Sequence, residues 1–419
     1  MRAAAALALL LALGTAPAAQ PVHAAGPVCR LDATPPDASA PPARRARRPA
    51  PCPPAERRAT FEVTYEGFPP EAETAFQAAV DTWACRIASA QPIRIAATWE
   101  TLGGATLGSA GPRLFSQVPG APSPDVWYPA ALADQIAGRD LDPSTADIEA
   151  SFNRSFPGWH FDLDSAPDRE YDLYTVVLHE IAHGLGLIGS LFVEDDQGLV
   201  GQEGRGPFVY DLLTTDGDGV SILDTGLYPP GSAALADALE REVRMAGPAV
   251  RAVAAEGAPL YAPRRWVQGA SYSHLDEDVF PLGTPDGLMT PFIARDETID
   301  QPGTVTCALL ADIGWTLAGD CADRVPPRSA AGGLLVEQRG PNPVRTETTV
   351  RLQSDVPRLV SVALVDVLGR RVRDYGRTAI IEGRPTDLTI SARDLASGVY
   401  VLQVLGGGDP AALSLTVVR

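Results

Sequence analysis

The chain contains no lysine and only five histidines and five cysteines, and these scarcities limit the classes of function that it can have. All 34 basic side chains are therefore Arg, and 52 acidic side chains outnumber them, which gives a formal net charge of -18. A nucleic-acid surface needs clustered cations, so this balance argues against nucleic acid as a partner. Beyond the N-terminus no apolar run is long enough to cross a bilayer, which excludes a transmembrane segment from the processed chain.

The N-terminus has the pattern of an export signal. Met1-Arg2 precedes an apolar run from Ala3 to Leu13, and small residues follow around Ala16 to Ala25. The run is short for a spanning helix but suits a cleaved signal peptide over residues 1–25. We therefore expect a protein that is secreted or held at the cell surface.

A chain of 419 residues is long enough for two or three folded units. Residues 26–58 are rich in Pro, Ala and Arg, and they cannot bury enough apolar surface to offset their ordering entropy. They are expected to form a pro-segment or linker, with order beginning at Phe61. A main domain over 59–322, a linker over 323–335 and a C-terminal domain over 336–419 complete the expected organisation.

The main domain is expected to be α+β, with a twisted sheet and a buried helix. Alternating apolar residues predict strands, and apolar residues three or four apart predict helices. The expected strands are 61–65, 93–99 and 148–153, and the expected helices are 71–87, 130–136, 172–187 and 233–245. Short β-rich runs at 350–352, 360–367, 388–390 and 399–404 predict a small all-β sandwich at the C-terminus.

The helix expected over 172–187 carries His179-Glu180-Ile181-Ala182-His183. Two histidines four residues apart lie on one helix face, roughly 40° apart, so both imidazoles can reach one metal ion. Glu180 is placed to contact a metal-bound water. Zn²⁺ lowers the pKa of such a water to about 7, and the carboxylate then accepts its proton and passes it to the leaving amine. The motif indicates zinc-dependent peptide hydrolysis.

A chance motif on a solvated helix face is the alternative. The surrounding residues are apolar, however, so polar groups without a function would lose solvation free energy there. Gly184 and Gly186 follow the motif and allow the chain to leave the helix through a left-handed turn. Catalytic zinc generally takes three protein ligands. His23 lies in the expected signal peptide, which leaves His160 and His274, and Met289 in Leu288-Met289-Thr290-Pro291 follows His274 by fifteen residues.

The segment His179 to Gly186 reads H-E-x-x-H-x-x-G and, with Met289, resembles the metzincin proteases. In most metzincins the third His follows this Gly by three positions, where the chain has Gly189. The leishmanolysin-like branch places that His far downstream, before a Leu-Met-x-Pro turn, and Asp312-Ile313-Gly314-Trp315 also resembles a segment of that branch. The resemblance covers 61–321, and it implies His179, His183 and His274 as zinc ligands, Met289 as the methionine turn and Gly186 as the helix-exit glycine.

Several assignments remain open at this point. By analogy, the strand 148–153 is the edge strand that pairs with substrate, or an ordinary sheet edge. Tyr272 either stabilises an oxyanion or, as we favour, packs. A gluzincin-like site would use Glu203 as its third ligand, but it leaves Gly186 and Met289 unexplained.

The cysteines and one acidic loop carry weaker signals. Cys307 with Cys321, and Cys29 with Cys52, are candidate disulfides of an exported chain. Cys29 or Cys52 is alternatively a thiolate that caps the zinc in a latent precursor, although a disulfide is the plainer interpretation. Asp216-Gly217-Asp218-Gly219 has acids suited to Ca²⁺, but a solvated turn is favoured because no complete Ca²⁺ loop follows.

The C-terminal domain resembles the type A sorting domain of type IX secretion. The matching pieces are Pro341-Asn342-Pro343, Val365-Asp366-Val367-Leu368-Gly369-Arg370, Leu395-Ala396-Ser397-Gly398-Val399-Tyr400 and Leu415-Thr416-Val417-Val418-Arg419. The usual Lys near the end is absent. The resemblance implies a secretion machinery as partner and passage across an outer membrane.

Taken together, these features predict a secreted zinc endopeptidase that acts on proteins or peptides with Glu180 as general base. A secreted adhesion or binding protein with a structural or degenerate zinc site is the second hypothesis. The intact Glu180 favours the first, because a binding module has no need of a proton acceptor there.

Overall fold

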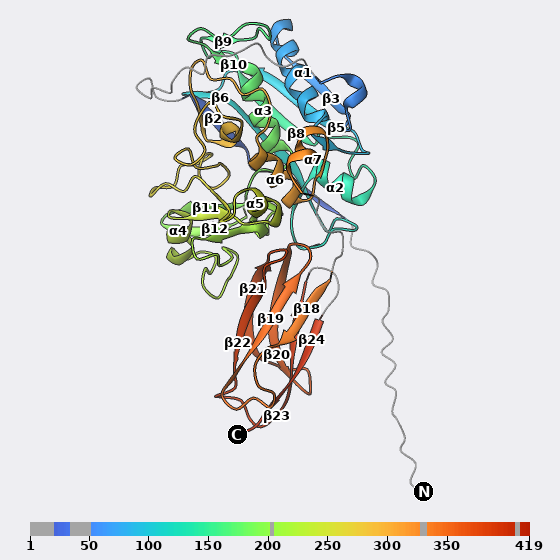
Figure 1. Cartoon of the computed structure of the whole chain (residues 1–419), viewed down its shortest axis with the longest axis vertical. Helices are drawn as coiled ribbons and strands as arrows, with labels where there is room; N and C mark the ends of the chain where they lie inside the picture. The colour runs from blue at the N-terminus through green and yellow to red at the C-terminus, as the bar shows by residue number, and fades with distance from the viewer. Residues whose placement is uncertain (1–20, 34–51, 202–204, 327–332, 407–410) are drawn as a thin grey trace.

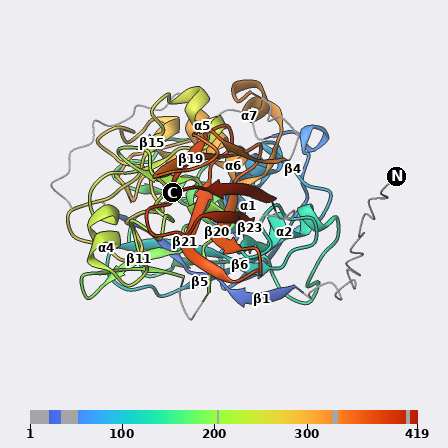
Figure 2. The same ribbon diagram turned by 90° about the horizontal axis from the view of Figure 1, so that it is seen from below.

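The computed structural model describes residues 21–33, 52–201, 205–326, 333–406 and 411–419. The chain is mixed α/β and rich in sheet. Figure 1 shows a large α/β unit with the C-terminal β unit projecting from one end, and Figure 2 views the molecule from that end.

The central sheet is built on three parallel strands and one long antiparallel strand. Strands β3 (Phe61–Glu66), β5 (Ile93–Glu100) and β8 (Ile148–Asn153) run parallel, and β6 (Thr106–Ser116) pairs antiparallel with β8. Alternate residues of β5 are buried, as expected of a strand with one face on the core. Beyond β6 the sheet continues through β2 (Cys29–Ala33) to β16 (Phe292–Ile293), and β1 (Val22–Ala25) and β7 (Tyr128–Pro129) also pair with β6.

Helices α1 (Pro70–Ala84) and α3 (Leu173–Gly184) pack against each other beside this sheet. Phe76, Ala79 and Trp83 are all fully buried on α1, at spacings of three and four. The Trp83 indole donates to the carbonyl of Leu178 at 3.0 Å. The remaining helices are α2 (Ala130–Ala137), α4 (Ala233–Leu239), α5 (Pro248–Val253), α6 (Thr304–Ile313) and α7 (Gly319–Arg324), with short turns η1 (Pro54–Glu56), η2 (Tyr210–Leu213) and η3 (Pro285–Met289).

Small sheets surround the core, two of them in the long segment between α3 and α6. They pair β4 (Ile87–Ala88) with β17 (Thr316–Leu317), β9 (Trp159–His160) with β10 (Tyr171–Asp172), β11 (Leu191–Glu194) with β12 (Gln197–Val200), and β13 (Thr214–Asp216) with β14 (Val243–Met245) and β15 (Ala258–Pro259).

The C-terminal unit consists of two antiparallel sheets around its own apolar core. One sheet contains β18 (Leu334–Gln338), β19 (Glu347–Ser354) and β22 (Thr386–Ser391). The other contains β21 (Arg371–Ile380), β20 (Arg358–Asp366), β23 (Gly398–Leu405) and β24 (Ala411–Val417). Both sheets contribute to one buried cluster that includes Val350, Leu364 and Leu402. The four β-rich runs expected from the sequence fall in β19, β20, β22 and β23.

The expectation that order begins at Phe61 is wrong. Strand β2 lies inside the expected pro-segment or linker 26–58, yet it belongs to the central sheet, with Cys29 and Leu31 buried. Strand β1 lies inside the expected signal peptide 1–25 and pairs with β6. Composition did not reveal this because a short polar segment can be ordered by adding to an existing strand. The cleavage point of the signal stays a prediction.

Two other element assignments need correction. The strand 148–153 exists as β8, but it lies between β5 and β6 and is not an edge, so it has no free side for a substrate. The helix expected over 233–245 ends at Leu239, and Val243–Met245 form β14 instead.

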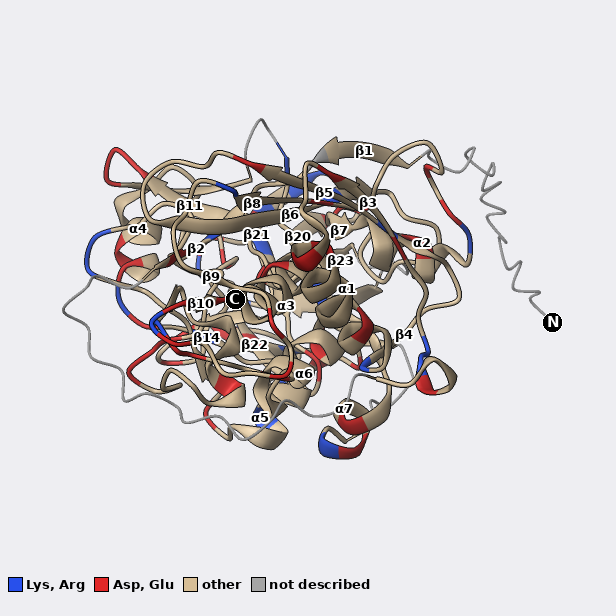
Figure 3. Cartoon of the chain, turned by 90° about the horizontal axis from the view of Figure 1, so that it is seen from above, with Lys and Arg blue, Asp and Glu red and all other residues tan. Residues whose placement is uncertain are grey.

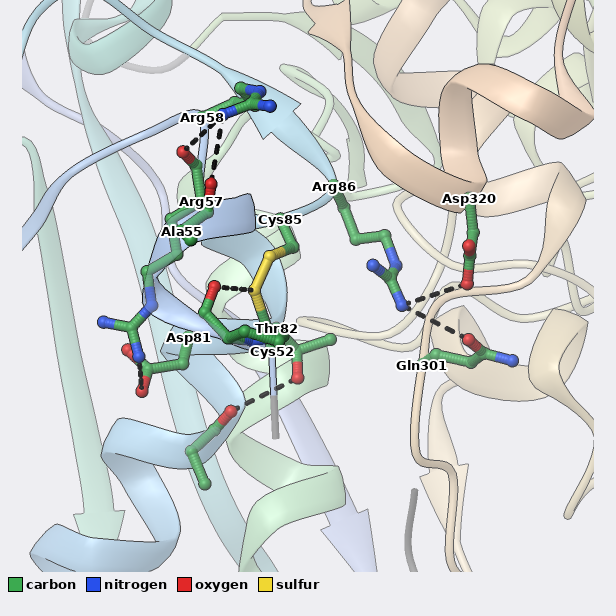
Figure 4. Close-up of a disulfide and its surroundings, with 12 residues drawn as sticks. Cys52, Ala55, Arg57, Arg58, Asp81, Thr82, Cys85, Arg86, Gln301 and Asp320 are labelled. Atoms are coloured by element: carbon green, nitrogen blue, oxygen red, sulfur yellow. Dashed lines mark hydrogen bonds and ion pairs between the residues drawn. A yellow bond between two sulfur atoms is a disulfide. The ribbon is translucent and has the colours of Figure 1, made fainter. Parts of the chain in front are cut away.

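One of the two disulfides expected from the sequence is present in the structure. Cys307 and Cys321 are bonded as expected, but Cys52 bonds to Cys85 at the end of α1 and not to Cys29. Figure 4 shows this bridge beside the Arg57–Asp81 ion pair, which holds the same segment against α1. Cys29 is left as a free, buried thiol.

Figure 3 shows Arg and acidic residues interspersed over the chain. Several Arg side chains are held by carboxylates, as in Arg94–Asp140 and Arg351–Asp387, both at 2.6 Å.

Candidate metal centre

Helix α3 is buried along its whole length, and its ends are fixed by local chemistry. At its start, Asp172 accepts from the backbone N–H of Thr175, which is an N-cap bond. At its end, Gly186 has a φ of 114°, and a Cβ there would lie 2.4 Å from Pro129 Cγ. Only glycine fits that exit, as the sequence indicated for Gly186. The helix itself spans Leu173–Gly184, within the expected 172–187.

Three imidazoles converge at one point beside α3. The Nε2 atom of His183 lies 3.0 Å from that of His179 and 3.1 Å from that of His274, and the third separation is 3.3 Å. All three side chains are buried. The residues expected as ligands are therefore brought together across a separation of 91 residues between His183 and His274.

Each imidazole is oriented by a backbone carbonyl that accepts from its Nδ1–H. Burial lowers the pKa of all three imidazoles, that of His179 to about 4. Each neutral ring has one N–H, which the carbonyl takes, so all three Nε2 lone pairs point at one another. The carbonyls are those of Leu288 for His179 (2.6 Å), Leu187 for His183 (2.7 Å) and Ala270 for His274 (2.7 Å).

This donor set fits a tetrahedral metal ion. Three converging lone pairs repel one another unless a cation lies between them. Nitrogens placed about 2.05 Å from Zn²⁺ at tetrahedral angles are about 3.3 Å apart, which is close to the observed separations. The carbonyl bonds supply the outer shell that metal-ligating histidines usually have.

The turn that contains Met289 connects two of the histidines. Met289 is buried at the end of η3, and its carbonyl accepts from the N–H of Leu275, next to His274. The preceding residue, Leu288, supplies the carbonyl that orients His179. The turn therefore fixes the position of His179 relative to His274.

Gly189 shows why the short-range third ligand is absent. A Cβ at Gly189 would lie 2.1 Å from the Tyr272 ring, so no side chain fits there. The Tyr272 hydroxyl donates to Asp211 at 2.9 Å and lies 3.0 Å from the hydroxyl of Thr214. Tyr272 thus packs, as favoured from the sequence. It has a φ of 73°, which turns the chain immediately before His274.

Glu180 is fully buried beside the histidines. Its Oε1 accepts from the N–H of Leu31 at 3.2 Å, and its Oε2 has no hydrogen-bond partner among the described residues. Burial raises the pKa of Glu180 well above its usual value, opposed by the Leu31 N–H. A divalent cation at the histidines would favour the ionised form instead. Gly108 on β6 makes room for this carboxylate, because a Cβ there would lie 3.2 Å from Glu180 Cγ.

Cys29 approaches the same point from β2. Its sulfur and one ring nitrogen each of His183 and His274 all lie within 4.8 Å of one another. Burial raises the pKa of the thiol to about 12, so a thiolate there requires a cation. The sequence suggested Cys29 as a disulfide partner of Cys52 or, alternatively, as a thiolate cap on the zinc. The Cys52–Cys85 bond excludes the disulfide. The pairing of β2 with the sheet had no periodic signal in the sequence.

The other candidates lie elsewhere. His160 is held by Glu170 at 3.0 Å and by the carbonyl of Ser165. Glu203 lies outside the described residues. The Asp216 carboxylate already accepts from the Val220 N–H and the Tyr228 hydroxyl, as in a hydrogen-bonded turn. Calcium at that loop stays a prediction.

Comparison with known families identifies the C-terminal unit. Residues 341–415 match the family described as "Secretion system C-terminal sorting domain". The chain is therefore secreted or displayed at the cell surface, and this unit interacts with a secretion machinery. Within the described residues, no helix has the length and apolar content to span a membrane.

No curated protein matches the chain. Among solved structures, dimeric latent PorU from Porphyromonas gingivalis is 21% identical over 25% of this chain and a tenth of its own (TM-score 0.18). A CARDB domain from Pyrococcus furiosus is 16% identical over 22% of this chain and 94% of its own (TM-score 0.18). At these TM-scores neither likeness bears on function.

We expect His274→Ala to lose the bound metal, because two nitrogen ligands from one helix hold Zn²⁺ far less tightly than three. His160→Ala is the matched control, since that imidazole is bonded to Glu170 and lies outside the cluster. Zinc content after dialysis, measured by atomic emission, should fall in the first variant only. Full zinc retention by His274→Ala would exclude His274 as a ligand.

The Asp211 network should leave a pH signature in stability. Burial raises the pKa of Asp211 from 3.8 to about 6. A carboxyl group whose pKa is higher in the folded than in the unfolded protein destabilises the folded state once the group ionises. This destabilisation is absent below the pKa of the unfolded protein and grows as the pH rises from 4 to 6. The unfolding free energy of wild type relative to Asp211→Asn should therefore fall by about 3 kcal/mol between pH 4 and pH 7. Urea titrations of chelator-treated proteins measure this difference, and a flat difference would contradict it.

Proposed function

We propose that the chain is a secreted zinc-dependent endopeptidase resembling the leishmanolysin-like metzincins. The observation that carries this proposal is the convergence of three imidazole lone pairs beside a buried carboxylate. His179, His183 and His274 would hold the metal. Glu180 follows His179 on the same helix, and its buried carboxylate would be the proton acceptor.

The zinc ligands, Glu180 and the backbone carbonyls would each have a separate role in peptide hydrolysis. Zinc, when bound, lowers the pKa of a coordinated water to about 7 and polarises the carbonyl of the scissile peptide. Glu180 would act as the general base, accepting a proton from water and returning it to the leaving amine. The carbonyls of Leu288, Leu187 and Ala270 keep the imidazoles from rotating, so the ligand geometry needs no reorganisation during the reaction.

A second function has one observation in its favour. Cys29 lies near His183 and His274, and a fourth protein ligand at zinc is typical of a structural site. An adhesion or binding protein with a structural zinc ion would need no more than this. A structural role for zinc does not explain why the Glu180 carboxylate is buried next to the histidines, because desolvating a carboxylate is costly.

Replacing Glu180 with Ala should abolish hydrolysis and leave the metal in place. Loss of a general base costs about 10²- to 10⁴-fold in rate. Casein and gelatin hydrolysis by protein recovered from the culture medium, with and without a zinc chelator, measures this, with zinc content as the control. Equal rates for wild type and Glu180→Ala would end the peptidase proposal.

The C-terminal unit should be needed for export and not for folding of the main unit, because it has its own apolar core and gives only Leu359 and Ala379 to the main one. Deleting 340–419 is expected to leave the truncated protein in the periplasm. Immunoblots of periplasm and medium, compared with the full chain, test this. Normal release of the truncated form would show that export does not depend on the unit.

A further inference from the structure

We infer that Asp211 is a positioning residue of the metal centre, whose carboxylate joins the segment that orients His183 to the segment that carries His274. This inference rests on the proposed function, because it concerns the same zinc site. It adds a residue outside the ligand set that determines how tightly the site binds zinc.

Asp211 lies in η2 and is fully buried. Four donors among the described residues surround its carboxylate. The Ser190 N–H donates to Oδ1 at 3.0 Å, and the Ser190 hydroxyl donates to Oδ2 at 2.6 Å. The Phe208 N–H donates to Oδ2 at 2.7 Å, and the Tyr272 hydroxyl donates to Oδ1 at 2.9 Å. The segments around residues 190, 208 and 272 therefore meet at one carboxylate.

Tyr272 connects this carboxylate to the third ligand. It is buried two residues before His274, and its φ of 73° turns the chain there. Asp211 holds its hydroxyl, and its backbone carbonyl accepts from the hydroxyl of Tyr210 at 3.0 Å. Both ends of Tyr272 are thus bonded to neighbouring residues of η2. This short turn therefore fixes where the chain enters the His274 loop.

The same carboxylate also holds the exit of α3. The carbonyl that orients His183 belongs to Leu187. Three residues later, Ser190 is bonded to Asp211 through both its N–H and its hydroxyl. Asp211 therefore joins the segment after His183 to the segment before His274, and the Nε2 atoms of these two histidines lie 3.1 Å apart.

The two joined segments also touch each other directly. The Gly189 N–H donates to the hydroxyl of Ser273 at 3.1 Å. The Tyr272 ring packs on Gly189, where a Cβ would lie 2.1 Å from the ring. Because this contact is so close, the bond that holds the Tyr272 hydroxyl sets how the two segments pack.

A carboxylate is needed at this position in spite of its effect on stability. Burial raises the pKa of Asp211 to about 6, so near neutral pH the charged group destabilises the fold. An amide would avoid this effect, but its nitrogen would face the Ser190 N–H at one oxygen position and the Phe208 N–H at the other. A destabilising group retained between two ligand segments points to a role in the site.

Weakening this connection should weaken zinc binding. His179 and His183 lie on one helix, whereas His274 lies on a loop whose position depends on the bonds to η2. Removing a residue that orients a ligand from outside the metal's own contacts typically lowers metal affinity by about 10- to 100-fold. A displaced His274 would also distort the tetrahedral arrangement of the three nitrogens.

Two variants of the full chain test the inference. Asp211→Asn removes the acceptor, and Tyr272→Phe removes only the hydroxyl and keeps the ring on Gly189. Asp134→Asn is the matched control, because Asp134 is also buried and its carboxylate accepts from the Leu141 N–H in the loop after α2. The dissociation constant for zinc, measured by competition with a chelating dye, should rise by about 10- to 100-fold in the first two variants and stay unchanged in the control.

Two further measurements separate positioning from a general loss of stability. Cobalt(II) loaded in place of zinc reports the coordination geometry, because tetrahedral cobalt absorbs visible light more strongly than cobalt with more ligands. These visible bands should weaken in both variants while urea titrations show that the proteins are folded. When saturated with zinc, the variants should hydrolyse a fluorogenic peptide with a kcat lower by at least about tenfold and an unchanged KM.

The outcomes separate the inference from the proposed function. Wild-type zinc affinity in Tyr272→Phe, or an equal loss of affinity in Asp134→Asn, would overturn the positioning role, and Tyr272→Phe decides if Asp211→Asn does not fold. Hydrolysis by wild type with unchanged affinity in the variants would leave the peptidase intact. Weaker zinc binding in the variants without hydrolysis by any form would support the positioning role and refute the peptidase. A wild type that binds no zinc would refute both.

Discussion

The site depends on three hydrogen bonds from imidazole Nδ1 atoms to backbone carbonyls. Each carbonyl fixes a tautomer as well as a ring orientation, and together they direct three Nε2 lone pairs at one point. The carbonyls come from the end of α3, from the η3 turn and from the loop before His274. Three separate parts of the chain must therefore be folded before a metal can be bound, which couples the site to the packing of the whole main unit.

The helical half of the site could be predicted from sequence because it is local. The spacing of four residues between His179 and His183, the apolar neighbours and Gly186 all act within one helix and its exit. His274 and Met289 were reachable only through a family resemblance, since no periodicity links them to α3. Their positions follow from tertiary contacts such as the Leu275–Met289 bond, which no local pattern encodes.

The ordered segment around β2 could not be predicted because its stability comes from contacts with another part of the chain. Residues 26–58 have the composition of a disordered chain, and the inference from composition is sound for a chain in isolation. Strand β6 supplies the hydrogen-bonding partners and the apolar contact that the segment lacks. The expectation that 148–153 is an edge strand was wrong for a related reason. The periodicity of β8 predicts a strand, but it does not show how many neighbouring strands pair with it.

The contact between Gly189 and Tyr272 makes two versions of this site mutually exclusive. A histidine at 189 would need the volume that the Tyr272 ring occupies, and the Tyr272 ring needs a residue without a side chain at 189. A chain that moved its third ligand from the helix exit to a distant loop would have to change both positions and also build the Asp211 network that holds the ring. Intermediates with one change would carry a clash or a cavity, so a single substitution cannot convert one arrangement into the other.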